Sequence, residues 1–310
     1  MNAVIQVKRL TKDFKEVKAV DDLSFSVGEG QVYGFLGQNG AGKSTTIRML
    51  LTLIKPSSGE IEIFGLNIKD HRKEILRQVG AIIERPDLYK YLTALENLRI
   101  FAAMSGVIVS EKKLMDQLAL VGLAERAHSK VKTYSQGMKQ RLGIATALVH
   151  NPRLIILDEP TNGLDPQGIA DVRNLILQLS KEMNKTLLIS SHLLSEMELI
   201  ADSMIIIDKG KKVVEGKVNE LFDPAETVVE LKTMNDDSTF EKLQQSRLQK
   251  YVQGKRNDCI LLKLHRDMIP GIVKELVQLD VPVVSFHSKH SLEDYFLSLT
   301  GHPHAEVVKN

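Results

Sequence analysis

The sequence predicts an α/β fold, with a core domain over residues 1–222 and a smaller α+β domain over residues 225–310. Three observations predict it. A glycine-rich segment lies between an apolar β-prone run and a helix-forming run, a second apolar run ends in two acids, and the pattern changes after Pro224. Strands that alternate with helices indicate a parallel sheet covered by helices. The core is therefore expected to be α/β.

The first part of the core contains β-prone runs and then a glycine-rich turn. Residues 4–27 hold short β-prone runs separated by Asp and Lys, which is typical of antiparallel strands at the front of a domain. Residues 31–36 suit a buried strand and residues 45–51 suit a helix. Residues 37–45 between them read Gly-Gln-Asn-Gly-Ala-Gly-Lys-Ser-Thr. Strand, glycine-rich turn and helix form the context that a phosphate-binding loop requires.

This segment has the residue types that bind a nucleoside triphosphate. Its glycines let backbone N–H groups turn inward around phosphate oxygens, and the helix N-terminus adds partial positive charge. Lys43 can reach the outer phosphates, and the Ser44 hydroxyl can bind Mg²⁺. The full motif in this context favours a nucleotide site over an ordinary glycine turn. The predicted contacts are Gly37, Gln38, Asn39, Gly40, Ala41, Gly42, Lys43, Ser44 and Thr45.

A helical region follows two further strands. Residues 60–64 and 79–83 are β-prone, and residues 86–150 have mainly helical periodicity, which indicates a helical subdomain inserted in the core. Near its end, Ser135 is suited to cap a helix, and Gly137 lets the backbone approach a ligand. Taken alone, this is a well-capped helix.

The α/β pattern returns at residues 154–159, which read Leu-Ile-Ile-Leu-Asp-Glu. An acid at the end of a buried strand in a phosphate-loop protein holds the Mg²⁺ shell, so Asp158 takes that role. Glu159 leaves the strand and can polarise an attacking water as a general base. We expect a helix with an apolar stripe that includes Met183, and buried strands at 186–190 and 204–207.

The C-terminal region has a different pattern. Short strands at 227–232, 259–264 and 283–287 alternate with a helix whose stripe is Ile269, Ile272, Val273, Leu276 and Val277. A final helix is expected over residues 291–301, followed by a tail that contains His302 and His304, which we expect to be tail residues and not metal ligands.

Composition excludes few functions. Lys+Arg number 41 and Asp+Glu 39, so the balance does not demand a nucleic-acid partner. Cys259 is the only cysteine, which suits a reducing compartment. The sequence has no apolar run of signal-peptide length at its start and no uncharged run long enough to span a membrane. We expect a soluble chain, or one that relies on membrane segments of another polypeptide.

With these motifs in this order, the chain resembles the nucleotide-binding subunits of ABC transporters over residues 1 to about 222. In that family a phosphate loop, a signature helix, a strand ending in Asp-Glu, a D-loop and a switch histidine follow one another. The resemblance implies a P-loop NTPase core of ABC type, with an antiparallel front sheet and a helical subdomain. The C-terminal α+β domain would be an accessory.

The resemblance also implies roles for individual residues. Ser135 and Gly137 would contact the γ-phosphate held by an opposite subunit. Asp165 would lie in the D-loop, His192 would be the switch histidine, and Phe14 would stack on adenine. Structural alternatives stay open: Asp165 before Pro166 also suits a helix cap, His192 could be a core histidine, and Phe14 could simply pack. The predicted catalytic residues are Glu159, His192 and Lys43.

Two departures from the common family pattern point to a subfamily. Glu84 stands where most members have a glutamine that touches Mg²⁺ and water; a carboxylate can still bind Mg²⁺ but cannot donate a hydrogen bond as an amide does. The signature reads Tyr-Ser-Gln-Gly-Met. Both features resemble the exporters for bacitracin resistance, lantibiotic immunity and multidrug efflux. The predicted metal-binding residues are Ser44, Asp158 and Glu84.

The function implied is ATP hydrolysis that drives an exporter whose membrane-spanning permease is another chain. The cofactors would be ATP and Mg²⁺, two copies would sandwich two ATP molecules head to tail, and the chain would lie peripherally on the cytoplasmic face of the cell membrane. Three alternatives are weaker: a soluble ABC ATPase without transport, an importer subunit, and a kinase built on the same loop. The first usually has coiled-coil insertions or tandem cassettes, and the kinase would need an acceptor pocket and a lid.

Overall fold

The computed structural model describes residues 3–221, 226–256 and 259–289. The chain divides into two compact units, Met1–Val218 and Asn219–Asn310. Each unit has its own sheet system and its own hydrophobic core.

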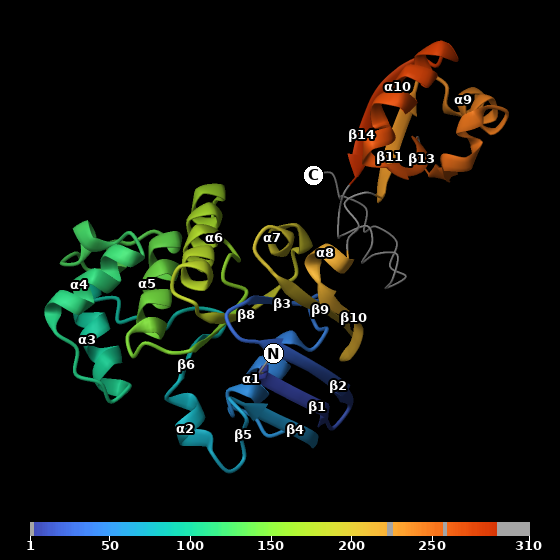
Figure 1. Ribbon diagram of the computed structural model, residues 1–310. Helices are drawn as coiled ribbons and strands as arrows, with labels where there is room; N and C mark the ends of the chain where they lie inside the picture. The colour runs from blue at the N-terminus through green and yellow to red at the C-terminus, as the bar shows by residue number, and fades with distance from the viewer. Residues whose placement is uncertain (1–2, 222–225, 257–258, 290–310) are drawn as a thin grey trace. The chain divides into compact units, whose positions relative to one another are not determined.

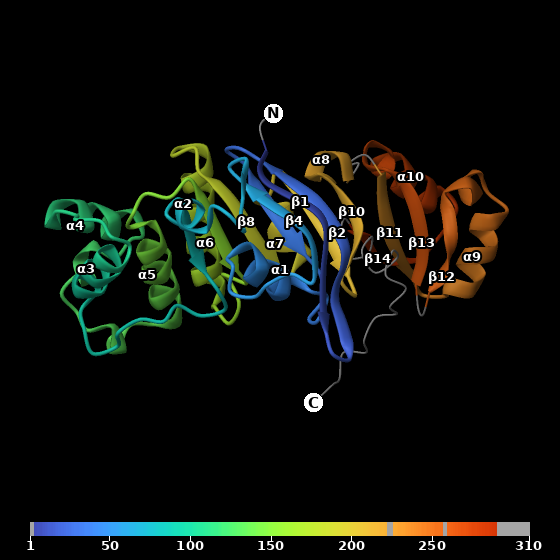
Figure 2. The same ribbon diagram turned by 90° about the horizontal axis from the view of Figure 1, so that it is seen from below.

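A four-stranded antiparallel sheet forms the front of the first unit, in the order β2-β1-β4-β5 (Figure 1), and β1, β2 and β4 are seen from another side in Figure 2. Its strands are β1 (Ala3–Phe14), β2 (Val17–Gly28), β4 (Ser58–Ile63) and β5 (Leu66–Asn67). The antiparallel pairing of the first two strands is as the sequence predicts. They are longer than the β-prone runs, because the pairing continues, with shifts in register, through Lys and Asp positions that are exposed or half-buried.

A six-stranded sheet lies behind it, in the order β10-β9-β3-β8-β7-β6. Its strands are β3 (Val32–Leu36), β6 (Val79–Ile82), β7 (Leu154–Asp158), β8 (Thr186–Ser191), β9 (Ser203–Asp208) and β10 (Lys211–Lys217). Every pairing is parallel except that of β10 with β9. All residues of β3, β7 and β8 are buried, as continuous apolar runs predict for strands covered on both faces.

Helices of the core join and cover these strands. They are α1 (Lys43–Leu50), α2 (Arg72–Leu76), α6 (Pro166–Lys181) and α7 (Leu194–Glu198). The short helix α8 (Val218–Leu221) follows β10 where the two units join in the chain. The prediction that Met183 continues the apolar stripe of α6 is wrong. That helix ends at Lys181, and Met183 is 42% exposed where the chain turns toward β8. Strand β10 was not predicted, because its Lys and Gly residues have low β propensity.

The helical subdomain consists of α3 (Ala94–Met104), α4 (Glu111–Leu120) and α5 (Gln136–Leu148), which are grouped together in Figure 1. A capping box starts α3, because the Thr93 side chain accepts from the Glu96 backbone and Glu96 accepts from the Thr93 backbone. The helical periodicity of residues 86–150 is confirmed for these helices.

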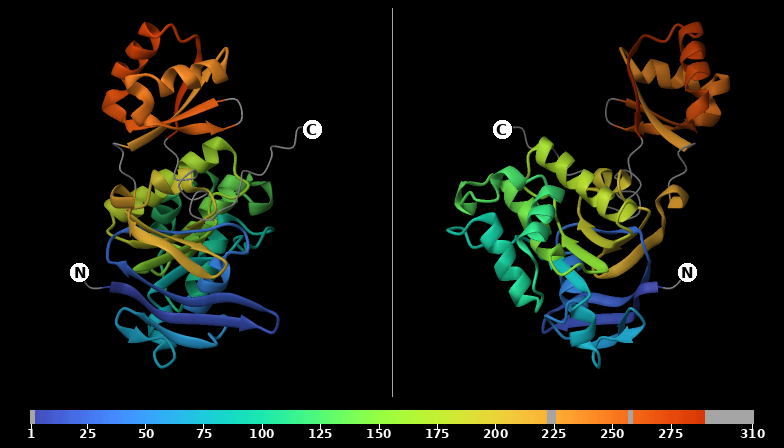
Figure 3. Two further views of the ribbon diagram at one scale, coloured as in Figure 1. Left: turned by 90° about the vertical axis from the view of Figure 1, so that its right-hand side faces the viewer. Right: turned by 60° about the vertical axis from the view of Figure 1, so that its left-hand side comes forward.

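The second unit has the order strand, helix, strand, strand, helix, strand. Its elements are β11 (Glu226–Thr233), α9 (Asp236–Gln244), β12 (Val252–Arg256), β13 (Cys259–His265), α10 (Ile269–Gln278) and β14 (Val283–Lys289). The sheet order is β12-β13-β11-β14, with all neighbours antiparallel. This is a ferredoxin-like topology, with both helices on one side of the sheet (Figure 3).

The buried face of α10 is narrower than the apolar stripe predicted for this helix. Ile272 and Leu276 of α10 are buried, whereas Val273 and Val277 are 39% and 67% exposed. Neither α9 nor β12 was predicted. Helix α9 contributes only one large buried apolar residue, Leu243, so its periodicity is weak. The predicted helix at 291–301 and the tail after it lie outside the described residues.

No helix in the described ranges has both the length and the apolar content that are needed to cross a membrane.

Candidate nucleotide site

Three parallel strands end at one edge of the six-stranded sheet. In the strand register Leu36 of β3 lies beside Ser191 of β8, and Asp158 of β7 lies beside Ser190. The chain leaves β3 through the glycine-rich loop into α1. The carboxyl ends of parallel strands, where helices begin, are where open α/β sheets bind ligands.

Glycine is required at the end of the loop. Gly42 caps α1 with φ of 106°, and a Cβ there would lie 2.5 Å from the carbonyl oxygen of Ala19. The first N–H groups of a helix have no partner within it, so those at the start of α1 are available to an anion. The predicted phosphate loop therefore has the backbone geometry that its motif requires.

Lys43 is a buried cation at the centre of this edge, with 6% of its side chain exposed. Its ammonium donates to the carbonyl oxygens of Gly37, at 2.7 Å, and Gln38, at 3.3 Å. It also lies 3.2 Å from Oε1 of Glu159, in an ion pair without the alignment of a hydrogen bond. A buried charge needs such partners because desolvation penalises it.

Glu159 connects this cation to His192. The Oε2 atom of Glu159 lies 2.7 Å from Nδ1 of His192, and the Glu159 backbone N–H donates to the Ser190 hydroxyl at 2.9 Å. Glu159 has a left-handed backbone, with φ of 51°, as the chain turns out of β7. Its carboxylate thus lies between Lys43 of α1 and His192 in the segment between β8 and α7.

Asp158 supplies a second, deeply buried carboxylate that is 1% exposed. Its Oδ1 atom accepts from the Ser190 hydroxyl at 2.5 Å, whereas Oδ2 is buried with no hydrogen-bond partner. Magnesium is usually bound by one or two carboxylates together with water and phosphate oxygens. The orphaned oxygen fits that requirement, although no group of three His, Cys, Asp or Glu side chains gathers in the described part of the chain. The sequence did not single out Ser190; the available signal was a pair of serines, Ser190 and Ser191, at the end of a fully buried strand.

Glu84 is two residues beyond β6, at this same edge of the sheet, because β6 pairs with β7. Its side chain is 63% exposed and pairs with Arg48 of α1 at 2.6 Å. Its predicted role at Mg²⁺ stays a prediction.

The predicted signature and D-loop residues are placed elsewhere. Ser135 is exposed and caps α5 by accepting from the Met138 backbone at 3.2 Å. Asp165 caps α6 by accepting from the Gly168 backbone at 2.8 Å. Within the described ranges, no hydrogen bond or ion pair joins either residue to the phosphate loop. The caps foreseen from the sequence are confirmed.

These two caps start neighbouring helices. A Cβ on Gly137 would lie 3.6 Å from the Cα of Gly168, and Arg141 of α5 lies 3.6 Å from Asp171 of α6. The signature segment and the D-loop segment therefore lie side by side.

Phe14 lies at the end of the hairpin between β1 and β2, where it pairs with Val17. Its ring is 46% exposed, and the Lys12 ammonium lies 4.9 Å from the ring centre. The exposed ring is free to stack on a planar group.

The sequence is similar to known transport proteins. The profile described as ABC transporter matches residues 20–162. An uncharacterised ABC transporter ATP-binding protein, YhcH of Bacillus subtilis, is 42% identical, with 99% of each chain covered. The bacitracin transport ATP-binding protein BcrA of Bacillus licheniformis is 44% identical over 97% of this chain and 98% of its own. The lantibiotic transport ATP-binding protein SrtF of Streptococcus pyogenes is 40% identical over 77% of this chain and 99% of its own.

The fold is also similar to solved structures. An ATP-binding subunit of an ABC transporter superposes with a TM-score of 0.63 and 33% identity, covering 70% of this chain and 91% of that one. A dimeric ATP-binding cassette bound to ADP and Pi gives a TM-score of 0.62 with 26% identity, covering 69% of this chain and 98% of that one.

Proposed function

The chain belongs to the ABC transporter family as an ATP-binding subunit, and we propose that ATP hydrolysis at Lys43, Asp158 and Glu159 drives export through a separate membrane polypeptide. One observation carries the assignment of the site. The carboxylate of Glu159 lies 3.2 Å from the Lys43 ammonium and 2.7 Å from His192, beside a buried Asp158 with an unpartnered oxygen. A phosphate-loop lysine, a metal-binding acid and a general base are the parts that this hydrolysis requires.

The residues divide the work as follows. When ATP binds the loop, Lys43 exchanges Glu159 for the outer phosphates, which frees the carboxylate. Glu159 then takes a proton from the attacking water, whose oxygen bonds to the γ-phosphorus as the bond to the bridging oxygen breaks, giving ADP and phosphate. His192 holds the Glu159 carboxylate in position. Asp158 and Ser44 would hold Mg²⁺, which neutralises charge on the phosphates.

A second copy of the chain would complete this site. Neither Ser135 nor Gly137 has a hydrogen bond or ion pair with the phosphate loop of its own chain in the described ranges, and Ser135, which caps α5, is exposed. We propose that they contact the γ-phosphate bound by the partner copy in a head-to-tail dimer, with Asp165 beside them. The similar cassette that is described as dimeric and bound to ADP and Pi supports the formation of a dimer.

Peptide antibiotics are the class of transported substrate that we propose, since relatives are described as bacitracin and lantibiotic transport proteins. The chain would lie on the cytoplasmic side of the membrane, bound to its permease. Residues 225–310 would be an accessory domain, because about three quarters of this chain covers 99% of the lantibiotic relative.

The Glu159→Gln variant tests the assignment, because glutamine keeps the shape of the side chain and cannot accept the proton. Phosphate release should fall about 10²- to 10⁴-fold while ATP binding persists. Glu198→Gln, on the exposed side of α7, is the matched control and should keep normal turnover. Near-normal phosphate release by Glu159→Gln would exclude Glu159 as the base.

Co-purification from detergent extracts tests the transport role separately. A membrane polypeptide should accompany the wild-type chain. Turnover that yields a phosphorylated small molecule in place of free phosphate would favour the kinase alternative, and an active chain that never binds a membrane partner would favour the soluble one.

A further inference from the structure

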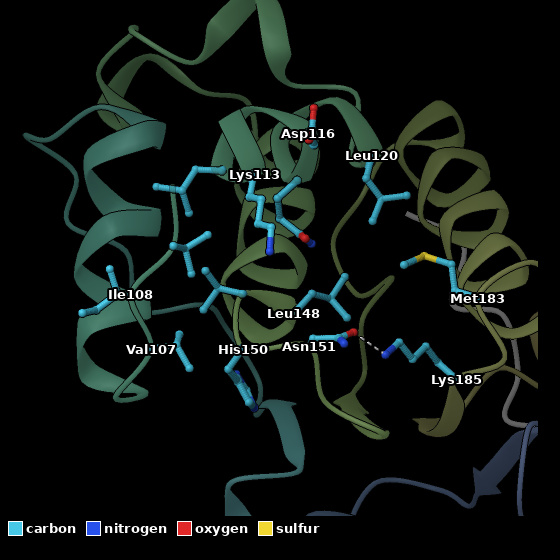
Figure 4. A pocket seen from close by; sticks show the side chains of 14 residues that line it. Val107, Ile108, Lys113, Asp116, Leu120, Leu148, His150, Asn151, Met183 and Lys185 are labelled. Atoms are coloured by element: carbon cyan, nitrogen blue, oxygen red, sulfur yellow. Dashed lines mark hydrogen bonds between the residues drawn. The ribbon is translucent and has the colours of Figure 1, made fainter. Parts of the chain in front are cut away.

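A cavity of about 530 Å³ lies between the helical subdomain and the core of the first unit (Figure 4). Its walls come from α4 and the segment before it, from the end of α5 with the residues that follow, and from the turn between α6 and β8. Pockets for small molecules commonly have volumes of about 300–1,000 Å³, so this one is large enough for a ligand.

The cavity is separate from the nucleotide site. His150 and Asn151 line it just before β7 begins, and Met183 and Lys185 line it just before β8 begins. These are the amino ends of strands whose carboxyl ends carry Asp158 and Ser190. A five-residue strand spans about 16 Å, which places the cavity at the opposite edge of the sheet from the phosphate loop.

Most of the lining is apolar, and part of it is open to solvent. Eight of the fourteen lining residues are Val, Ile, Leu or Met. Ile108 is fully exposed and Met183 is 42% exposed, whereas Leu114 is buried. Such a surface favours a ligand with an apolar body, because covering it removes hydrocarbon from water.

The polar groups in the cavity favour an anion. In Figure 4 the Lys113 ammonium reaches inward among the lining side chains, and the Asp116 carboxylate points the other way. The Gln117 side chain also lines the cavity, and its Nε2 atom is buried without a hydrogen-bond partner, so a turn of this side chain would present an unsatisfied amide donor to a ligand. Lys113 has no ion pair with a carboxylate in the part of the chain that the structure describes.

Lys185 and His150 also line the cavity, and burial affects the charge of both side chains. Lys185 donates only to neutral oxygens, Oδ1 of Asn151 at 2.6 Å and the Pro152 carbonyl at 2.8 Å. Burial lowers the pKa of Lys185, so a nearby negative charge would stabilise its protonated form. Burial also lowers the pKa of His150, which leaves that imidazole neutral near pH 7.

We propose that this cavity is a binding site for an amphipathic carboxylate, with its hydrocarbon chain on the apolar wall and its carboxylate between Lys113 and Gln117. The cation and the unsatisfied amide donor supply charge-assisted hydrogen bonds to the head group. The site is independent of the nucleotide chemistry proposed above.

Decanoate is the probe, titrated into the full chain by isothermal calorimetry, with and without ATP. Saturable binding at one site per chain is expected. Lys113→Glu should weaken it at least about 10-fold, since a hydrogen bond to a charged group is lost and like charges face each other. Gln117→Leu should weaken it about 3- to 10-fold by removing the amide donor.

Two controls make the test decisive. Lys112→Glu makes the same change of charge at the preceding residue of α4, which is exposed and outside the cavity lining, and should change the affinity less than about 2-fold. Decan-1-ol has the chain without the carboxylate and should bind more weakly than decanoate. The proposal is overturned if decanoate shows no saturable binding, if both lysine variants act alike, or if decan-1-ol binds as tightly. ATP binding by Lys113→Glu shows that the variant is folded.

Discussion

The proposed ATP site has two halves, the phosphate loop with its surrounding side chains and the signature segment, and they differ in which partners their polar side chains find. Around the phosphate loop, Lys43 of α1, the consecutive Asp158 and Glu159 at the end of β7, and His192 after β8 are joined by an ion pair, by hydrogen bonds or through Ser190. At the signature segment, Ser135 is exposed and its hydrogen bond stays within its own helix, as does that of Asp165 in the D-loop.

The difference shows which part of the site one chain can build alone. Charged groups at a buried edge must find partners within the fold, because an unpaired buried charge is costly. An exposed cap needs nothing beyond its own first turn. The signature half can therefore be stable in isolation and still lack its functional partner, which is the phosphate-loop half of another copy.

The largest effect is expected in the buried half. Lys43→Ala removes the cation that faces the outer phosphates, so ATP affinity should fall about 10- to 100-fold. Equilibrium binding of a fluorescent ATP analogue measures it. Lys69→Ala, at an exposed lysine, is the control and should bind normally. If Lys43→Ala binds the ATP analogue as tightly as the wild type, Lys43 contributes to the folded structure and not to nucleotide binding.

Mixing two damaged chains tests whether the halves belong to different copies. Lys43→Ala spoils the phosphate half and Gly137→Asp spoils the signature half, so a heterodimer retains one intact pair. ATP-dependent dimers should appear on size exclusion in the mixture and not with either variant alone. If wild-type chains dimerise with ATP while the mixture stays monomeric, the two halves do not meet between copies.

Ser135→Asp separates capping from phosphate binding. Aspartate caps a helix about as well as serine, whereas Ser135→Ala should cost about 0.5–2 kcal/mol in free energy of unfolding. The aspartate variant should keep its stability, measured by urea unfolding, and lose ATP-dependent dimerisation because its carboxylate would face phosphate. Ser110→Asp, at the cap of α4, is the matched control and should dimerise as the wild type does. Normal dimerisation of Ser135→Asp would reduce Ser135 to a cap.

The smallest effect is expected at the hairpin. Phe14→Ala should weaken ATP binding by about 3- to 10-fold, since aromatic stacking contributes roughly 0.5–1.5 kcal/mol. Val17→Ala, at the paired and 63% exposed position, should leave the affinity unchanged. Equal affinities of the two variants would assign Phe14 to packing.

The sequence by itself predicted the elements whose signals are local. The glycine loop between β3 and α1, the apolar run of β7 and the caps at Ser135 and Asp165 follow from residue type and spacing over a few positions. Elements with weak local signals, such as β10 and α9, were not predicted. The end of α6 was predicted too late, because Met183 fits its apolar period although the helix ends at Lys181.

Only the tertiary structure decided which side chains meet. Strand pairing sets Ser190 beside Asp158, 32 residues away in the chain, and the turn after β7 directs Glu159 between Lys43 and His192. The cavity at Lys113 likewise needs three segments that are distant in sequence. The spacing of residues along the chain predicts hydrogen bonds within one turn or one helix. Contacts between elements depend on sheet order and packing, which no local pattern encodes.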